Sequence, residues 1–204
     1  MPHPPDFFEV RLDYLGDILD HLERKMSILP APIILTARDS REGGMGNLSL
    51  AQRSELFSRF FAHAKYVDVE LRLARAFKPL LAQARKRNVG VILSFHDFRS
   101  TPTSRSLRAK AALAKKHGGN IFKVATRTDK PADLARLVNF ITSSPAGLPI
   151  SAMGMGKLGA ISRLLLARAG SALNYGSLGQ ANVEGQLPID VLRSATNART
   201  RGRR

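Results

Sequence analysis

The feature that most constrains the fold is a regular alternation of apolar, β-rich runs with amphipathic segments. Seven such runs recur at intervals of about 25–35 residues: FFEVRLDYL, PIILTAR, YVDVEL, GVILSFHDF, NIFKVAT, PISAMGM and SALNYGSL. Strands that alternate with helices at this spacing predict an α/β fold, in which a parallel sheet is connected by crossover helices.

Helix signals lie between these runs. In the segment 48–64, Ser49 and Gln52 have the spacing of a capping box. The segment 101–117 ends at a Gly-Gly pair that predicts a helix C-terminus at Gly118. The segment 130–144 places Pro131 in a first helical turn, where proline is tolerated.

Seven units without a break in composition favour a TIM-type (β/α) barrel over an open sheet. We therefore expect one catalytic barrel domain over residues 1–192, followed by a basic, disordered tail over residues 193–204. Barrel enzymes build their active sites at the C-terminal ends of the strands. Polar residues gather near those ends in this chain: Arg11, Asp13, Thr36, Arg38, Asp68, Glu70, Ser94, His96 and Lys123. The first run is not followed by a glycine-rich nucleotide loop.

Composition narrows the function classes. The chain has 204 residues and no cysteine, which excludes disulfides, thiolate metal sites and cysteine nucleophiles. It shows neither a signal peptide nor a run of about 18 apolar residues, so we expect a soluble, cytoplasmic protein without a membrane partner. The net charge of +16 suggests nucleic-acid binding, but three tyrosines and no tryptophan give little base stacking. A small anionic substrate accounts for the charge equally well.

A lysine interrupts the buried-strand pattern of NIFKVAT. Lys123 has two interpretations from its own residues alone. Its stem packs while its ammonium group reaches water, as many lysines do. Alternatively, burial lowers the pKa of the amine so that it attacks a carbonyl group.

Other candidate residues accompany Lys123. Glu9 and Arg11 alternate on one strand and therefore face one side. Arg38 and Glu42 bracket the turn in TARDSREGG as a candidate ion pair. His96 in SFHDF and Arg163 in MGMGKLGAISR complete the set. Each has an ordinary structural explanation, but those explanations do not account for their gathering at one end of a barrel.

With these motifs in the same order, the sequence resembles the type I 3-dehydroquinate dehydratase family from about Phe8 to Gln186. The resemblance implies a cofactor-independent lyase on a (β/α) barrel, commonly a homodimer. Such an enzyme acts in the shikimate pathway of aromatic amino-acid biosynthesis. It converts 3-dehydroquinate to 3-dehydroshikimate and water by syn elimination, through a Schiff base on a lysine.

The resemblance also implies roles for individual residues. Lys123 corresponds to the Schiff-base lysine, His96 to the general acid and base, and Glu42 to the carboxylate that orients the histidine. Arg163 corresponds to the arginine that holds the substrate carboxylate. The remaining substrate-binding positions are Glu9, Arg11, Arg38, Met153, Tyr175, Asn182 and Gln186.

Two departures from the family pattern leave alternatives open. Asn182 stands where the family usually has a small hydroxyl residue before the final Gly-Gln. Only about seven residues precede EVRLDYL, whereas family members carry a further strand and helix there. The first βα unit is therefore expected to be missing, through a truncated gene model, a true seven-stranded barrel or a degenerate enzyme. The functional alternatives are another imine-forming lyase of the class I aldolase type, and a basic scaffold or nucleic-acid-binding protein without lyase activity.

Overall fold

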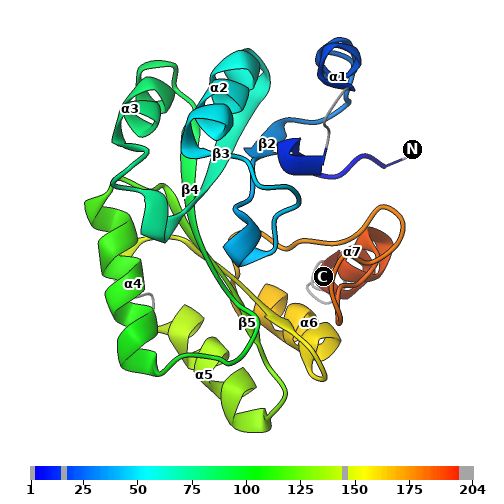
Figure 1. Cartoon of the computed structure of the whole chain (residues 1–204). Coiled ribbons are helices and arrows are strands. Elements are labelled where there is room, and N and C mark those ends of the chain that lie inside the picture. Colours follow the sequence, from blue (N-terminus) through cyan, green and yellow to red (C-terminus); the bar gives the residue numbers. More distant parts are fainter. Residues whose placement is uncertain (1–2, 15–17, 144–146, 198–204) are drawn as a thin grey trace. The chain divides into compact units, whose positions relative to one another are not determined.

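The computed structural model describes residues 3–14, 18–143 and 147–197, and its described strands and helices alternate along the chain (Figure 1). The strands are β1 (Phe8–Arg11), β2 (Ile33–Thr36), β3 (Ala64–Glu70), β4 (Gly90–Asp97), β5 (Ile121–Arg127) and β6 (Ile150–Met155). The α-helices are α1 (Leu19–Met26), α2 (Leu50–Phe60), α3 (Lys78–Lys86), α4 (Ser104–Lys116), α5 (Pro131–Thr142), α6 (Gly159–Ala169) and α7 (Ile189–Asn197). The short 3-10 helices are η1 (Leu12–Tyr14), η3 (Ser40–Glu42), η4 (Phe61–His63) and η5 (Leu71–Leu73).

The chain divides into two compact units. The first contains Met1–Phe95 and His117–Asn120, and the second contains His96–Lys116 and Ile121–Arg204. The division falls inside β4, so this strand runs from the first unit into the second. The single catalytic domain that we expected over residues 1–192 stays a prediction.

In the first unit, neighbouring strands from β1 to β4 pair in parallel, in chain order. The capping box predicted at the start of α2 is present, with the Gln52 backbone N–H donating to Ser49 Oγ at 3.2 Å and the Ser49 N–H donating to Gln52 Oε1 at 2.9 Å. Side chains from α2 and from the turn before α3 fill the layer beside the strands. Phe57 and Phe77 meet edge to face there, with ring centroids 6.3 Å apart.

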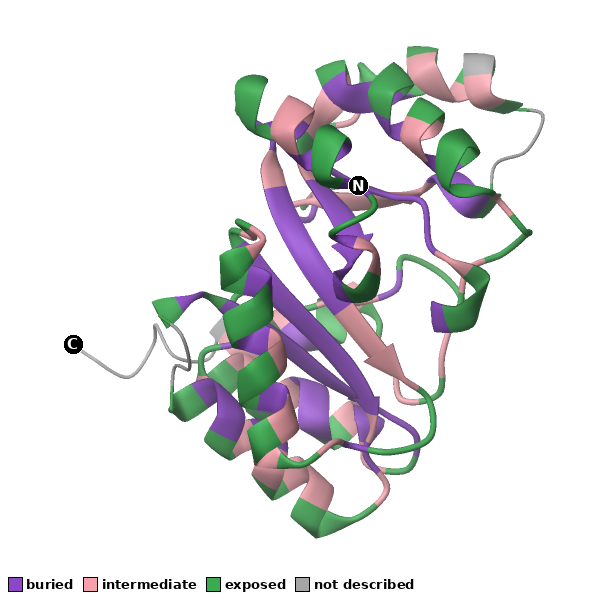
Figure 2. Ribbon diagram, turned by 60° about the vertical axis from the view of Figure 1, so that its left-hand side comes forward, coloured by how far each residue is buried: buried purple, intermediate pink, exposed green. Residues whose placement is uncertain are grey.

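In the second unit, β5 and β6 pair in parallel and Lys123 lies opposite Ser151. Successive side chains on a strand point to opposite faces. One face of β5 packs on α5, where the rings of Phe122 and Phe140 meet edge to face with centroids 6.3 Å apart. The other face carries Lys123 and Ala125. Both strands are buried, whereas the helices show green exposed stretches (Figure 2).

The predicted α5 and α4 boundaries are confirmed. Helix α5 begins with Pro131 at its first position. Helix α4 ends at Lys116, two residues before Gly118, whose φ of 75° suits glycine. Among the described residues, no helix has both the length and the hydropathy needed to cross a membrane.

The prediction of a seventh strand at SALNYGSL is wrong. Only Ser177 of this segment forms a bridge, an isolated parallel one with Pro188. The Ala172 N–H donates to Ile150 O at 2.8 Å, but Leu173 O instead accepts from Ser151 Oγ at 2.7 Å. Because side chains satisfy part of its backbone, the segment does not continue a regular ladder beside β6.

The C-terminal residues differ from the expected tail at its start. Helix α7 runs from Ile189 to Asn197, so residues 193–197 are helical and the boundary at residue 192 lies inside a helix. Leu192 is buried and holds this helix to the second unit. Residues 198–204 of the expected tail lie outside the described residues.

Candidate functional site

The central candidate is Lys123 in the middle of β5. Only 4% of the residue is exposed, so its ammonium group does not reach water along the surface. The Nζ atom lies 3.8 Å from the centroid of the Tyr175 ring. Ala125, Met153 and the same Tyr175 ring belong to the hydrophobic cluster beside it. Burial therefore argues against the first interpretation of this lysine, because its amine is held against an apolar wall and not at the surface.

Arg163 on α6 is the second buried cation of this unit. It is 4% exposed, and its Nη1 donates to Tyr175 O at 2.9 Å. Its Nε has no hydrogen-bond partner, and no carboxylate of the described residues forms an ion pair with it. Burial alone lowers the pKa of Arg163 to about 10. A buried guanidinium without an anion has the capacity to bind one.

Tyr175 links the two cations. Its ring covers the Lys123 amine, and its main-chain carbonyl accepts the hydrogen bond from Arg163. The arrangement therefore places an amine and an anion-binding group on either side of one residue. Such a site suits a substrate that carries both a carbonyl group and a carboxylate.

His96 belongs to the same unit as Lys123 and Arg163. It lies next to the last residue of β4 and is half-buried. The C-terminal end of a parallel strand is where the sequence predicted it, and partial exposure leaves an imidazole able to exchange protons.

The loop that contains Asn182 and Gln186 is folded on itself and packed against α6. The Asn182 N–H donates to Gln186 Oε1 at 2.8 Å, and the Gly156 N–H donates to Glu184 O at 3.2 Å. Gly185 has a φ of 84°, and a Cβ on it would lie 2.6 Å from the Cα of Gly159. The glycine pair therefore allows this loop to contact the start of α6 directly. Asn182 itself is exposed.

The first unit holds the other four predicted polar residues, Glu9, Arg11, Arg38 and Glu42. Arg38 is 4% exposed and is fixed by three partners from β3 and β4. Its Nη2 lies 2.8 Å from Asp68 Oδ2, and its Nη1 lies 3.4 Å from Glu70 Oε1 and 2.6 Å from Ser94 Oγ. Burial lowers the pKa of Arg38, but the charges of Asp68 and Glu70 more than offset it, so the pKa stands above its ordinary value.

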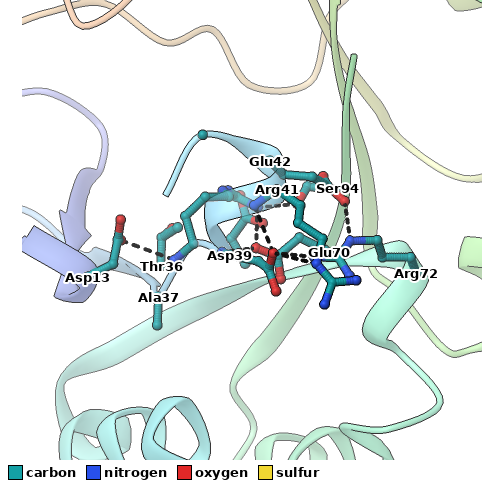
Figure 3. A network of polar contacts seen from close by, with 12 residues as sticks. Asp13, Thr36, Ala37, Asp39, Arg41, Glu42, Glu70, Arg72 and Ser94 are labelled. Atoms are coloured by element: carbon teal, nitrogen blue, oxygen red, sulfur yellow. Dashed lines mark hydrogen bonds and ion pairs between the residues drawn. The ribbon is translucent and has the colours of Figure 1, made fainter. Parts of the chain in front are cut away.

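The candidate ion pair between Arg38 and Glu42 is not formed. Glu42 ends η3 and is 7% exposed, and its Oε1 accepts from Arg72 Nε at 3.1 Å (Figure 3). Arg38 turns instead toward the carboxylates of β3, which lie beside it on the sheet. The Gly-Gly pair after Glu42 is required by the turn, since a Cβ on Gly44 would lie 2.0 Å from Arg38 O.

Glu9 and Arg11 on β1 have separate partners. Thr36 Oγ1 donates to Glu9 Oε1 at 2.9 Å. The Arg11 guanidinium holds Asp13 with two bonds, Nε to Oδ1 at 2.9 Å and Nη2 to Oδ2 at 2.7 Å, and stacks on the Tyr14 ring at 4.7 Å. Both residues keep their side chains only partly buried, as a binding wall requires.

Three residues that were not predicted as site residues fix this polar cluster: Arg53, Asp68 and Glu70. Arg53 on α2 is fully buried, and it bonds Ala37 O at 2.7 Å and pairs closely with Glu70. Asp68 and Glu70 were noted as polar strand residues but were not assigned to the site. Their alternation on β3 was the available signal. Arg53 gave none, because an arginine in an amphipathic helix normally faces solvent. The described residues contain no group of three potential metal ligands.

The chain is similar in sequence to known proteins. The model of the type I 3-dehydroquinase family matches residues 2–203. The chain is 35% identical to the 3-dehydroquinate dehydratase of Shouchella clausii, over 93% of this chain and 79% of that protein. It is 32% identical to the Geobacillus enzyme of the same name, over 93% and 78%.

Solved structures agree with these relatives. The 3-dehydroquinate dehydratase of Geobacillus kaustophilus superposes with a TM-score of 0.89 at 29% identity, over 98% of this chain and 82% of that one. A type I 3-dehydroquinate dehydratase from Clostridium difficile, with covalently modified comenic acid, gives a TM-score of 0.86 at 26% identity, over 95% and 81%.

Proposed function

Because the chain belongs to the type I 3-dehydroquinase family, we propose that it converts 3-dehydroquinate to 3-dehydroshikimate and water. One observation carries the proposal: within a single compact unit, buried Lys123 and buried Arg163 contact the ring and the carbonyl of the same residue, Tyr175. An amine that attacks the ketone and a guanidinium that binds the carboxylate are the two groups that this substrate needs.

Imine formation starts the reaction. The Lys123 amine adds to the ketone carbon, and loss of water gives a protonated imine. The imine draws electrons from the neighbouring carbon and so acidifies its C–H bond. Apolar neighbours such as Ala125 and Met153 exclude water from the place where the amine attacks.

His96 carries the protons in the elimination. As a base, it removes the proton from the carbon next to the imine, and that electron pair forms the new carbon–carbon double bond. As an acid, it gives the proton to the departing hydroxyl group, which leaves as water. In a syn elimination both groups leave from one face, so a single histidine serves both steps. Water then hydrolyses the imine and restores Lys123, so the net change is loss of one water.

The other residues bind the substrate. Arg163 holds the carboxylate in a planar, bidentate contact. Glu9, Arg38 and Gln186 bind hydroxyl groups, Arg11 and Asn182 complete the polar wall, and Met153 and Tyr175 contact the ring. Glu42 orients His96. The apolar cluster of Met153 with Tyr175 supports the ring contact.

Turnover of 3-dehydroquinate tests the proposal directly. The product is a conjugated enone, whose ultraviolet absorbance rises as the reaction proceeds. We expect turnover by the natural sequence, none by Lys123→Met, and a loss of at least about 100-fold for His96→Ala, the lower end of general acid–base contributions. The absence of enone with the natural sequence would overturn the proposal.

The same preparation separates the other possibilities. Turnover of a different carbonyl substrate, without any of dehydroquinate, would indicate a lyase of the class I aldolase type. Salt-dependent nucleic-acid binding without lyase activity would indicate a basic scaffold. The homodimer implied by the resemblance stays a prediction that sedimentation equilibrium measures.

A further inference from the structure

Arg72 contacts both ends of the turn that carries Glu42. It lies on η5, directly after β3, and one third of its side chain is exposed. Its Nη2 lies 2.5 Å from Asp39 Oδ1, and its Nε lies 3.1 Å from Glu42 Oε1 (Figure 3). Asp39 is the N-cap of η3 and Glu42 is its last residue. One guanidinium therefore joins the first and last carboxylates of this turn.

Other groups of the first unit hold the turn itself. The Asp39 carboxylate accepts from the Arg41 N–H at 2.9 Å, and Arg53 on α2 lies 3.5 Å from its other oxygen. Glu70 on β3 accepts from the Asp39 N–H at 2.8 Å. Arg11 on β1 donates to Gly43 O at 3.2 Å. These contacts fix the start and the backbone of the turn, whereas Arg72 also contacts the side chain of Glu42.

The electrostatics agree with the geometry. Burial lowers the pKa of Arg72, but the hydrogen bond and charge of Asp39, followed by the charge of Glu42, more than offset it. The pKa of Arg72 therefore stands above its ordinary value. Burial raises the pKa of Asp39, but the bond from the Arg41 N–H and then the bond from Arg72 more than offset it, so the pKa of Asp39 stands below its ordinary value.

We propose that Arg72 is a positioning residue for the dehydration, which holds the Glu42 carboxylate in the orientation that the reaction needs. The inference rests on the proposed function. Neither the motifs that carry the family resemblance nor the roles that it implies include Arg72. The loss of an ordinary surface ion pair would leave kcat unchanged.

Arg72→Gln and Arg41→Gln form a matched pair of variants for the test. Arg41 lies in the same turn and approaches the same Asp39 carboxylate at 3.9 Å, but its side chain is 80% exposed. Both changes remove one positive charge near the turn. Only Arg72→Gln removes a contact to Glu42.

The readout is kcat for dehydroquinate turnover, with KM and the unfolding midpoint measured alongside. For Arg72→Gln we expect kcat to fall about tenfold or more, as for displaced catalytic groups, with KM changed less than about twofold. Arg72→Lys should recover only part of kcat, since it lacks the planar fork. Arg41→Gln should match the natural sequence.

Two outcomes overturn the inference: a kcat of Arg72→Gln that equals that of Arg41→Gln, or a loss of activity in Arg72→Gln that lies in KM and not in kcat. If Arg72→Gln no longer unfolds cooperatively, Arg72→Lys takes its place in the test. A kcat of Arg72→Lys equal to that of the natural sequence would then overturn the inference. No turnover by the natural sequence would instead refute the proposed function, so the two failures are distinguishable.

Discussion

Replacing Arg163 should stabilise the free protein and at the same time abolish its binding of substrate. The guanidinium is 4% exposed, with one hydrogen bond to Tyr175 O and an Nε without a partner. Burial alone lowers its pKa to about 10. The side chain is thus charged at neutral pH in a buried environment that disfavours its charge. A bound substrate carboxylate would offset this cost.

The expected change in the free energy of unfolding follows from that pKa. The ordinary pKa of arginine is about 12.5, and one pKa unit corresponds to about 1.4 kcal/mol, so the lowered value corresponds to about 3 kcal/mol against the folded state. The sign is that of a cation with a lowered folded pKa: the unfolded chain holds the proton more tightly. The destabilisation is fully present below about pH 10 and is relieved only as the pH rises above that value. Loss of the bond to Tyr175 offsets about 1 kcal/mol, which leaves a gain of about 2 kcal/mol for Arg163→Met.

Urea denaturation at pH 7 measures the change, with Arg168→Met as the control. Arg168 lies on the same helix but is exposed in its last turn, where a cation is mildly favourable, so its loss should leave stability unchanged or slightly lower. We expect kcat/KM for dehydroquinate to fall at least about 100-fold in Arg163→Met, as for a lost buried charge contact, and to be unchanged in Arg168→Met. An Arg163→Met protein that is less stable than the natural one would refute the reasoning, because its guanidinium would then be satisfied without a ligand.

Three further predictions concern the framework. Arg53→Met should destabilise the protein by about 3 kcal/mol in urea denaturation, because it leaves buried Glu70 without its closest partner. Arg59→Met in the same helix breaks a half-exposed ion pair with Glu23 and should cost less than about 1 kcal/mol. Equal losses would contradict this. Gly185→Ala should lower activity without global unfolding. The φ of residue 185 is 84°, and the added Cβ would lie 2.6 Å from the Cα of Gly159, so the loop would be forced away from α6. Full activity would refute the close approach. Burial raises the pKa of Asp13, but the bonds from Arg11 and the Met45 N–H more than offset it, so the pKa of Asp13 stands below its ordinary value. The stabilisation by this carboxylate is therefore present above about pH 4 and is lost as the pH falls through the lowered pKa. Asp13→Asn should flatten the acid side of the stability curve measured by urea denaturation, and an unchanged curve would contradict this prediction.

The sequence predicted the elements that local chemistry specifies. The Ser49–Gln52 capping box, the proline start of α5 and the apolar β5 strand are local signals, and the structure confirms each. SALNYGSL carries the same β-rich composition but is not a strand, and the Ser151 side chain on β6 bonds the Leu173 carbonyl in place of a ladder partner. That outcome depends on residues more than 20 positions away, which composition does not report.

In the candidate site too, contacts between distant residues could not be predicted from local signals. Lys123 was ambiguous from its own strand, and only its burial in the folded chain and the Tyr175 ring beside it indicate an interior amine. The partner of Glu42 was assigned wrongly, since proximity in sequence suggested Arg38 while the sheet brings Arg72. Long-range ion pairs are set by the order of strands, and a single sequence carries no direct record of them.

The most direct test of the central claim is covalent capture on Lys123. The protein is incubated with 3-dehydroquinate, reduced with borohydride and digested, and the peptide that contains β5 is analysed by mass spectrometry. The account predicts an adduct on Lys123 that contains the reduced substrate or product skeleton, present also in His96→Ala and absent from Lys123→Met. An unmodified β5 peptide, or an adduct on any other lysine, would contradict it.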